Sequence, residues 1–402
     1  MSSCRARATA ADEGRHMQTF LEEIFRPFHR PEQRRWAQVY LRGLIHVSGR
    51  KTPRSMARSE QLPPKAAQGL HQFISASPWD WEAVRRRLAL RAAASAAPYA
   101  WTVTELLIPK RGEHSVGVHP CLDTATGRTV NCQRAVGLFL VTDAQCFPVD
   151  WSLVLDGSWG WDPERRLRAR IPDEETARPA GACVLDYVTR VAAQPGLPRV
   201  PWVLDLTRSE DASGILVGLA RHRVDIVCEV DPGQIVLAGH RAPTVTTIGK
   251  LMEEHNTRQP YAMVRQTTDG RSRTVPLYTY AGTARLPRRS TGGDGGGRGY
   301  RLLELLDPDG RQPARYWITT LADRCAERIL TLMRSRTAVR ATLTALQKRY
   351  GVLDFEGRSF PGWHRHMTMT AAAYVYQHLH GHVTPAQATA PATAPALAGA
   401  VG

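Results

Sequence analysis

The chain has 402 residues, a formal net charge of +16 and an isoelectric point near 10.0. Only five of its 53 Lys and Arg residues are lysines. Arginine presents a planar, permanently charged fork that binds phosphate through two hydrogen bonds, so this composition favours a nucleic-acid partner over a small acidic substrate. A coding bias toward arginine explains the ratio of arginine to lysine equally well, but it does not explain the net charge.

The cysteine pattern and the hydropathy bound the compartment. Seven cysteines are scattered along the chain without a C-x-x-C pair. An odd count without such pairs argues against a zinc ribbon and against a disulfide framework, and a reducing compartment fits best. The N-terminus lacks the apolar core of a signal peptide, and no window holds about 18 uninterrupted apolar residues. We therefore expect a cytoplasmic protein with no membrane partner, located at the nucleoid if it binds DNA.

The N-terminal part predicts a helical domain. Residues 1–16 are polar and small and are predicted to be disordered. Over 17–97 apolar residues recur at intervals of three and four, which is the spacing of amphipathic helices. Four cations lie around short helical patterns within 49–73, as they do in a helix-turn-helix element: Lys51, Arg54, Arg58 and Lys65. The alternative is the solvated face of a helical bundle, and both interpretations stay open.

At residue 98 the pattern changes to that of an α/β core. Runs of strand length, rich in β-branched residues, lie at 99–108, 134–143, 200–207 and 224–230. Helical patterns precede and follow the third run. Strands with helices between them predict a mixed sheet with some parallel pairing over residues 98–230.

The rest of the chain predicts an insertion and the end of the core. Residues 231–300 hold short alternating segments and a Gly-rich stretch, which predict a β-rich insertion with a linker. Over 301–380 a hairpin through Pro-Asp-Gly precedes a long helix, at about 322–350, and a buried apolar helix. The Ala/Thr/Pro repeats of 381–402 predict a disordered tail.

Several segments carry a resemblance to a known family. They are PKRGEHSVGV, NCQRAVGLFLVTD with PVDWSLVLDGSW downstream, VLD ending at Asp205, and GVLDFEGRSFPGWHRHMTM near the end. In these segments and in the order of its elements, the chain resembles the DDE transposases of bacterial insertion sequences over residues 17–380. The resemblance implies an α/β fold with an RNase H-like mixed sheet flanked by helices, an N-terminal helical DNA-binding domain and a β-rich insertion. It also implies double-stranded DNA as the partner, with a homodimer as one assembly.

Members of this family hold two Mg²⁺ ions with three carboxylates, and the paired metals activate the attacking oxygen and stabilise the leaving one. The first carboxylate lies on the first strand, upstream of a Pro-Lys-Lys-Gly motif. Alignment on Pro109 and Gly112 puts Thr104 at this position and Glu105 directly after it. Adjacent residues of a strand point to opposite faces, so we expect Glu105 to face away from the site unless a bulge turns it.

The second and third positions follow from the same resemblance. Asp205 matches the acid at the end of the fourth strand, which makes it the candidate metal ligand. The third acid belongs to a Tyr, Arg, Glu, Lys pattern on the late helix, whose positions here are Met333, Arg336, Arg340 and Gln347. Only the arginine of that pattern remains, and the expected triad reads Thr104, Asp205 and Arg340.

A single carboxylate does not hold two divalent ions, and a guanidinium at the third corner repels them. The repulsion is roughly 4 kcal/mol for unit charges about 4 Å apart at an effective dielectric constant near 20. We therefore expect no cofactor, and Mg²⁺ only if the protein is active. Four other acids are weighed as replacements and match no family position: Asp211, Glu304, Asp307 and Glu327.

DNA binding can outlast cleavage because the cations remain. The candidate DNA-binding residues are Lys110, Arg111, Arg336, Arg340, Lys348, Arg358 and His364. The alternative role for Arg340 is a structural ion pair with Asp205.

Three functions are compatible with the sequence. The leading one is a transposase-like DNA-binding protein that has lost strand cleavage, a pseudoenzyme on a nuclease fold. The second is an active DDE transposase that uses Glu105, Asp205 and an unidentified third acid in transposition. The third is a repurposed pocket with a new activity or a ligand other than DNA.

Overall fold

The computed structural model describes residues 14–123, 127–209, 211–239, 242–254, 260–268, 271–280, 282–287, 298–307, 313–321 and 326–380. The predicted tail at 381–402 and most of the Gly-rich stretch lie outside these ranges. Residues 14–16, which were predicted to be disordered together with 1–13, belong to a helix that runs to residue 24.

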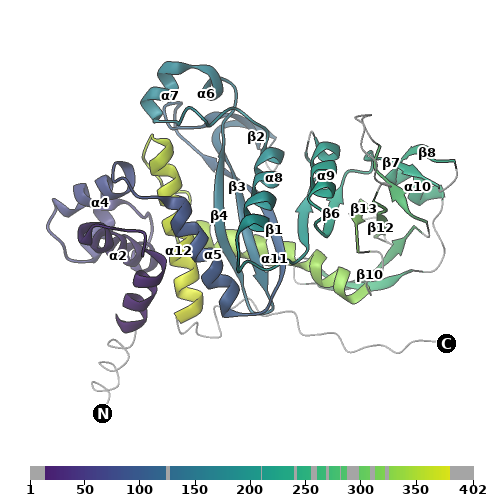
Figure 1. The fold of residues 1–402 in the computed structure, drawn as a ribbon, viewed down its shortest axis with the longest axis horizontal. Helices are drawn as coiled ribbons and strands as arrows, with labels where there is room; N and C mark the ends of the chain where they lie inside the picture. The colour runs from purple at the N-terminus through teal and green to yellow at the C-terminus, as the bar shows by residue number, and fades with distance from the viewer. Residues whose placement is uncertain are drawn as a thin grey trace, which may run out of the picture.

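Helices form the N-terminal part, as the apolar spacing predicts. The first helix is followed by α2 (Pro31–His46), α3 (Pro53–Ser59), α4 (Ala66–Ser75) and α5 (Trp81–Ser95). Thr52 and Ser55 form a capping box at the start of α3, and the Asp80 carboxylate caps α5. The buried helix α12 (Phe360–His380) packs against α2, α4 and α5 and joins this lobe to the sheet (Figure 1).

A ten-stranded mixed sheet forms the core, which confirms the predicted α/β class. Its order is β2-β3-β1-β5-β6-β13-β12-β10-β9, with β4 paired to β3. The strands are β1 (Pro98–Pro109), β2 (Val118–Asp123), β3 (Arg128–Thr142), β4 (Cys146–Val154), β5 (Trp202–Asp205), β6 (Ile226–Val230), β9 (Ala262–Thr268), β10 (Arg271–Thr279), β12 (Arg301–Leu305) and β13 (Arg315–Thr319). Strands β1, β5 and β6 are parallel, as the helices between them require. A mixed sheet flanked by helices is the architecture of an RNase H-like core.

Helices cover both faces of the sheet (Figure 1). On one face α8 (Ala180–Ala193) packs on β3, where the Tyr187 hydroxyl donates to the Val136 carbonyl, and α9 (Ala212–Arg221) packs on α8. On the other face lies α11 (Ala326–Arg349), whose Ser335 hydroxyl is hydrogen-bonded to that of Thr102 on β1. The two faces of the sheet are therefore covered by different helices.

The predicted β-rich insertion is only partly separate from the core. Strands β7 (Ile235–Ala238), β8 (Thr244–Thr247) and β11 (Ala284–Arg285) form a small sheet beside α10 (Ile248–Glu254). Strands β9 and β10 instead extend the main sheet through β12. The expectation that all of 231–300 is an insertion outside the core is corrected accordingly.

Two further features differ from the expectations or lie outside them. Cys121 on β2 and Cys132 on β3 form a disulfide, although the scattered cysteines argued against such bonds. Their spacing along the chain gave no sign of the pairing. The antiparallel pairing of β2 with β3 brings the two cysteines together. The short helices α6 (Ser158–Trp161) and α7 (Pro163–Ala169) follow β4 and form the protruding tip at the top of Figure 1.

Within the described ranges, no helix has the length and apolar character needed to cross a bilayer.

Candidate active site

The parallel strands β1, β5 and β6 place the sequence-predicted acid Asp205 at the last residue of β5. The register of β1 and β5 pairs Thr102 with Val203, and two residues further along it sets Thr104 level with Asp205. Since neighbouring residues in register share a face of the sheet, Thr104 and Asp205 both belong to the face that α11 covers. Thr104 thus occupies the corner where the resemblance expects the first carboxylate.

A second acid, which sequence analysis missed, lies directly beside Asp205. Glu229 on β6 pairs in register with Asp205 and is buried, with 6% of its surface exposed. The signal was present in the sequence, because Glu229 is the only charged residue of the strand Ile226–Val230. A carboxylate buried within an apolar strand needs a partner, since burying an unpaired charge is costly.

The partners of both acids are arginines. The Arg336 guanidinium of α11 forms ion pairs with Asp205 and with Glu229, so it joins the two carboxylates. Arg315 on β13 approaches Glu229 with both arms of its fork, at 2.6 Å from Nε to Oε1 and 2.7 Å from the terminal nitrogen to Oε2. The second oxygen of Asp205 accepts from the Thr207 hydroxyl at 2.6 Å and from the Thr207 amide at 3.1 Å. Both oxygens of each carboxylate therefore have hydrogen-bond donors from the protein.

The surroundings of the pair are positive. The ring of Trp317 lies 5.5 Å from the guanidinium carbons of both Arg315 and Arg336, so the two cations contact the same aromatic ring. Burial lowers the pKa of Arg336, Asp205 opposes this change, and nearby Arg340 lowers the pKa further. Arginine nonetheless keeps its proton in proteins. Three cations therefore face two carboxylates.

The structure separates the other predicted catalytic residue from this site. Glu105 forms a two-armed ion pair with Arg134 of β3, at 2.7 and 3.0 Å. Its neighbour Thr104 belongs to the α11 face, so Glu105 points to the opposite side, as strand alternation predicts. The structure does not bring Glu105 and Asp205 together.

The four acids weighed as replacements have other positions. Asp307 is held by Arg273 at 2.8 Å, and Asp211 caps α9 by accepting from the Gly214 amide. Glu304 is buried on β12, where burial raises its pKa, and Glu327 lies in the first turn of α11. None of the four forms an ion pair or hydrogen bond with Arg336 in the part of the chain that the structure describes.

The donor set at the site does not fit a pair of Mg²⁺ ions. Mg²⁺ requires oxygen ligands in a near-octahedral arrangement, and two ions need more carboxylates than this site holds. Both carboxylates are already engaged by Arg336. Across the described ranges, no cluster of three or more His, Cys, Asp or Glu side chains could hold a metal ion.

Comparison with known proteins agrees with this architecture. The family of DDE superfamily endonucleases matches residues 23–271, which is more than half of the chain. The chain belongs to the DDE superfamily endonucleases. None of the curated proteins compared with it matches significantly. The matched range of this DDE protein ends before α11, so Arg336 and Arg340 are placed at the site by the geometry alone.

Three of the predicted DNA-binding residues of the DDE protein are engaged inside the fold. Arg336 holds the acid pair, as described. The Lys110 ammonium donates to the Phe355 carbonyl at 2.6 Å, and burial lowers its pKa to about 8. His364 is 7% exposed and stacks on Trp81. Each of these three side chains thus has a contact inside the fold, and their role in DNA binding stays a prediction.

The other predicted contacts lie on the surface. Arg111, Arg340, Lys348 and Arg358 are exposed. Arg340 forms no ion pair with the described residues, and the predicted alternative of a bond to Asp205 is taken by Arg336, one helical turn earlier. In the helix-turn-helix-like segment Lys51 is buried and donates to the Val47 carbonyl, whereas three cations on α3 and the turn before α4 are exposed: Arg54, Arg58 and Lys65.

Proposed function

We propose that this member of the DDE superfamily binds double-stranded DNA and does not cleave it. The observation that supports the loss of cleavage is the bridging guanidinium of Arg336, which contacts Asp205 and Glu229 where the fold brings two carboxylates together. A fixed cation between the acids supplies the charge compensation that a metal supplies in the active family. It offers no open coordination position for water or phosphate.

Metal entry at this site has two costs. Arg336 must first move away from Asp205 and Glu229, and both carboxylates then lose a charged hydrogen-bond partner. Arg315 and Arg340 would then still lie beside the incoming ion, and each such pair is repulsive by several kcal/mol at short distance. Asp205 and Glu229 are therefore proposed as a structural anion pair that positions α11 on the sheet.

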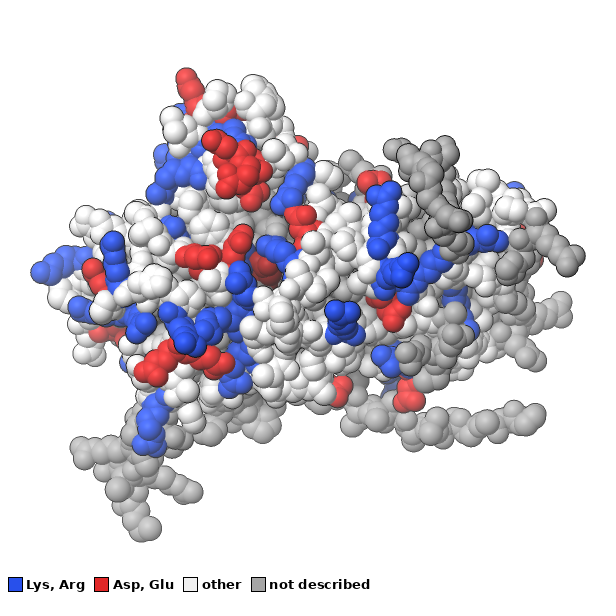
Figure 2. Space-filling model, in the orientation of Figure 1, with Lys and Arg blue, Asp and Glu red and all other residues white. Residues whose placement is uncertain are grey.

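The charge distribution supports DNA binding through the N-terminal helices. Residues 14–97 hold 15 Lys and Arg residues against six Asp and Glu residues, so they carry nine of the 16 excess positive charges. Figure 2 shows Lys and Arg side chains spread over the lobe of α2 and α4. Exposed arginines contact phosphates and fix a protein on the duplex. The exposed cations Arg54, Arg58 and Lys65 are the proposed phosphate contacts.

One experiment tests both halves of the proposal. The full chain is incubated with a fluorescent duplex at low salt, with Mg²⁺ or with EDTA, and the bound fraction and the strand lengths are measured. We expect binding that does not depend on Mg²⁺ and that weakens with salt, together with intact strands. Shortened strands in Mg²⁺ would refute the loss of cleavage, and the absence of any duplex binding would refute the DNA-binding half.

A second candidate is an active enzyme in which Glu229 serves as an acid of the site. The in-register position of Glu229 beside Asp205 favours this alternative, because the two carboxylates could share one ion if Arg336 swung away. Cleavage that requires both acids would support it over our proposal.

A homodimer and a location at the nucleoid stay predictions.

A further inference from the structure

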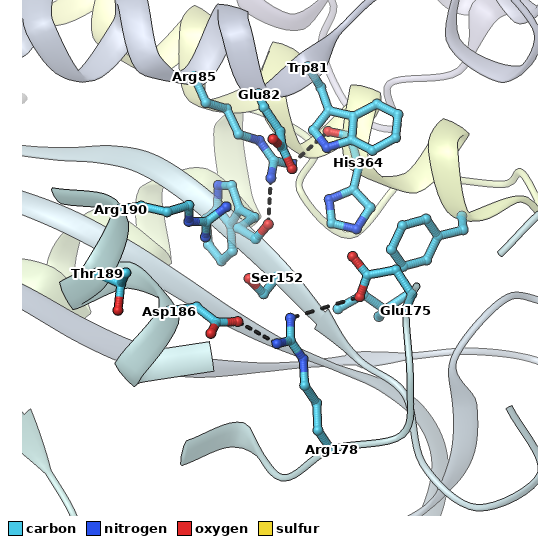
Figure 3. Close-up of a pocket in the computed structure, with 13 residues that line it drawn as sticks. Trp81, Glu82, Arg85, Ser152, Glu175, Arg178, Asp186, Thr189, Arg190 and His364 are labelled. Carbon is cyan, nitrogen blue, oxygen red and sulfur yellow. Dashed lines mark hydrogen bonds and ion pairs between the residues drawn. The ribbon is translucent and has the colours of Figure 1, made fainter. Parts of the chain in front are cut away.

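A cavity of about 270 Å³ lies away from the acid pair, between α5, β4, α8 and the start of α12. Its walls include three aromatic side chains and one histidine: Trp81, Trp151, Phe360 and His364. In Figure 3 the His364 ring lies beside Trp81, while Ser152, Glu175 and Arg178 lie across from it. The cavity thus has an aromatic wall at one side and a polar wall at the other.

The aromatic wall contains buried polar atoms without partners. The His364 ring is held between Trp81, at 5.2 Å between centroids, and Phe360, at 4.3 Å. Its Nδ1 and Nε2 are both buried, and neither has a hydrogen-bond partner among the described residues. The indole nitrogen of Trp151 is also buried without a partner in the same ranges. Buried polar groups are costly when nothing satisfies them, so these atoms point to a ligand.

The protonation state of His364 defines what it offers. Burial lowers the pKa of His364 well below its usual value, and the charges of Arg85, Arg190 and Arg365 lower it further. A neutral imidazole carries one N–H donor and one acceptor lone pair. His364 thus offers one donor and one acceptor, whereas the Trp151 side chain is fully buried and packs against Phe139.

The arginines that line the cavity are already paired with carboxylates. Arg178 pairs with Asp186 and lies 3.8 Å from the Glu175 carboxylate, as Figure 3 shows. Arg190 lies 3.2 Å from Asp150, and the buried Arg85 pairs with the same carboxylate at 2.9 Å. Each guanidinium of the described wall thus has a carboxylate partner already, so the cavity suits an uncharged ligand rather than a phosphate or a carboxylate.

We propose that this cavity binds a small, planar, uncharged nitrogen heterocycle of the size of a pyrimidine or purine base, through the edge of His364. Such a ring carries hydrogen-bond donors and acceptors in one plane and fills a narrow, aromatic-walled space. It can come from a free base or nucleoside, or from an unpaired base of a nucleic-acid strand.

The test measures binding of cytosine, adenine and their nucleosides to the full chain by calorimetry, with toluene and inorganic phosphate as comparison ligands. We expect at least one base to bind with a dissociation constant on the order of 1 mM or below, and to bind more tightly than either comparison ligand. His364→Phe keeps the aromatic stack and removes both nitrogens, so the affinity should fall about tenfold. His71→Phe, the same change on the exposed face of α4, should leave the affinity unchanged.

A second readout does not depend on the folding of a variant. In wild-type protein with ¹⁵N-labelled histidine, the base should shift the nitrogen resonances of one buried histidine, which the His364→Phe spectrum identifies. Duplexes with and without one unpaired base then distinguish the source: tighter binding of the unpaired base indicates a strand-held ligand, and binding of the free base alone indicates a soluble one. The absence of binding by every base, or equal binding by His364→Phe or of toluene, would overturn the proposal.

Discussion

Arg336 on α11 forms an ion pair with Asp205 at the end of β5, 131 residues earlier in the chain. The contact joins the late helix to the parallel strands of the sheet. The same guanidinium reaches Glu229 on the next strand. Arg336 thus joins two carboxylates in an internal network of charges, and several consequences can be measured.

Removal of Arg336 should uncover the acids. In Arg336→Ala, Asp205 loses its cation and Glu229 keeps only Arg315, so we expect the free energy of unfolding to fall by about 2 kcal/mol. We also expect weak Mn²⁺ binding in calorimetry, which the wild type should lack. Arg334→Ala, an exposed arginine of the same helix, is the matched control and should change neither quantity. Equal Mn²⁺ binding by wild type and variant would contradict this role of Arg336.

The N-terminal cations should carry part of the DNA affinity. Replacement of Arg54, Arg58 and Lys65 by Ala should weaken duplex binding and lower the slope of log affinity against log salt by about 0.9 for each phosphate that is no longer neutralised. Fluorescence anisotropy at several salt concentrations measures both effects. The control removes three exposed arginines elsewhere, Arg199, Arg221 and Arg328. An equal weakening in the control would show that only net charge matters, not this surface.

The stability should depend on pH through His366. Burial lowers its pKa to about 4, and its nitrogens contact the Tyr40 hydroxyl and the Gly351 carbonyl at 2.8 and 2.9 Å. Between about pH 6.5 and 4 the unfolded chain binds a proton that the folded chain does not, so stability falls as the pH falls through this window. The free energy of unfolding should fall by about 3 kcal/mol at most over this range of pH.

Urea unfolding between pH 4 and 7.5 measures this dependence. His364 titrates in the same direction, so His366→Gln should remove only part of the slope, whereas the exposed control His29→Gln should retain all of it. A His366→Gln slope equal to that of the wild type would show that His366 does not titrate in this way.

The disulfide between Cys121 and Cys132 should protect both thiols. Alkylation in denaturant without reductant, followed by mass spectrometry, should modify Cys146, Cys183 and Cys228 and leave the pair unmodified until a reductant is added. Reduction should lower the free energy of unfolding by about 2–3 kcal/mol, because the unfolded chain loses its closed loop. Cys121→Ser should match the reduced wild type in stability. Alkylation of Cys121 and Cys132 without reductant would exclude the bond.

Much of the fold could be predicted from sequence. The strands β1, β3, β5 and β6 and the helices α8, α9 and α11 follow from short apolar runs and helical spacing, which are local signals. The extension of the sheet by β9 and β10 was not predictable in this way, because a strand of an insertion and a strand of the core have the same alternation. Only the pairing of β10 with β12 decides between them.

The site was predictable in part. Asp205 and the opposite orientation of Glu105 follow from a strand end and from strand alternation. Glu229 was missed because it matches no position of the family pattern, although a lone acid in the apolar strand Ile226–Val230 was a visible sign. The pairing of Asp205 with Arg336 instead of Arg340 depends on the rotation of α11, which no local pattern fixes.

We propose that the arginine bridge between Asp205 and Glu229 leaves no working metal site. The most direct measurement is nicking of supercoiled plasmid by the purified full chain in Mg²⁺ and in Mn²⁺, compared with Asp205→Asn and Glu229→Gln. We predict that the wild type nicks no faster than either variant and that all three still bind the plasmid. Metal-dependent nicking by the wild type that either substitution abolishes would contradict the account.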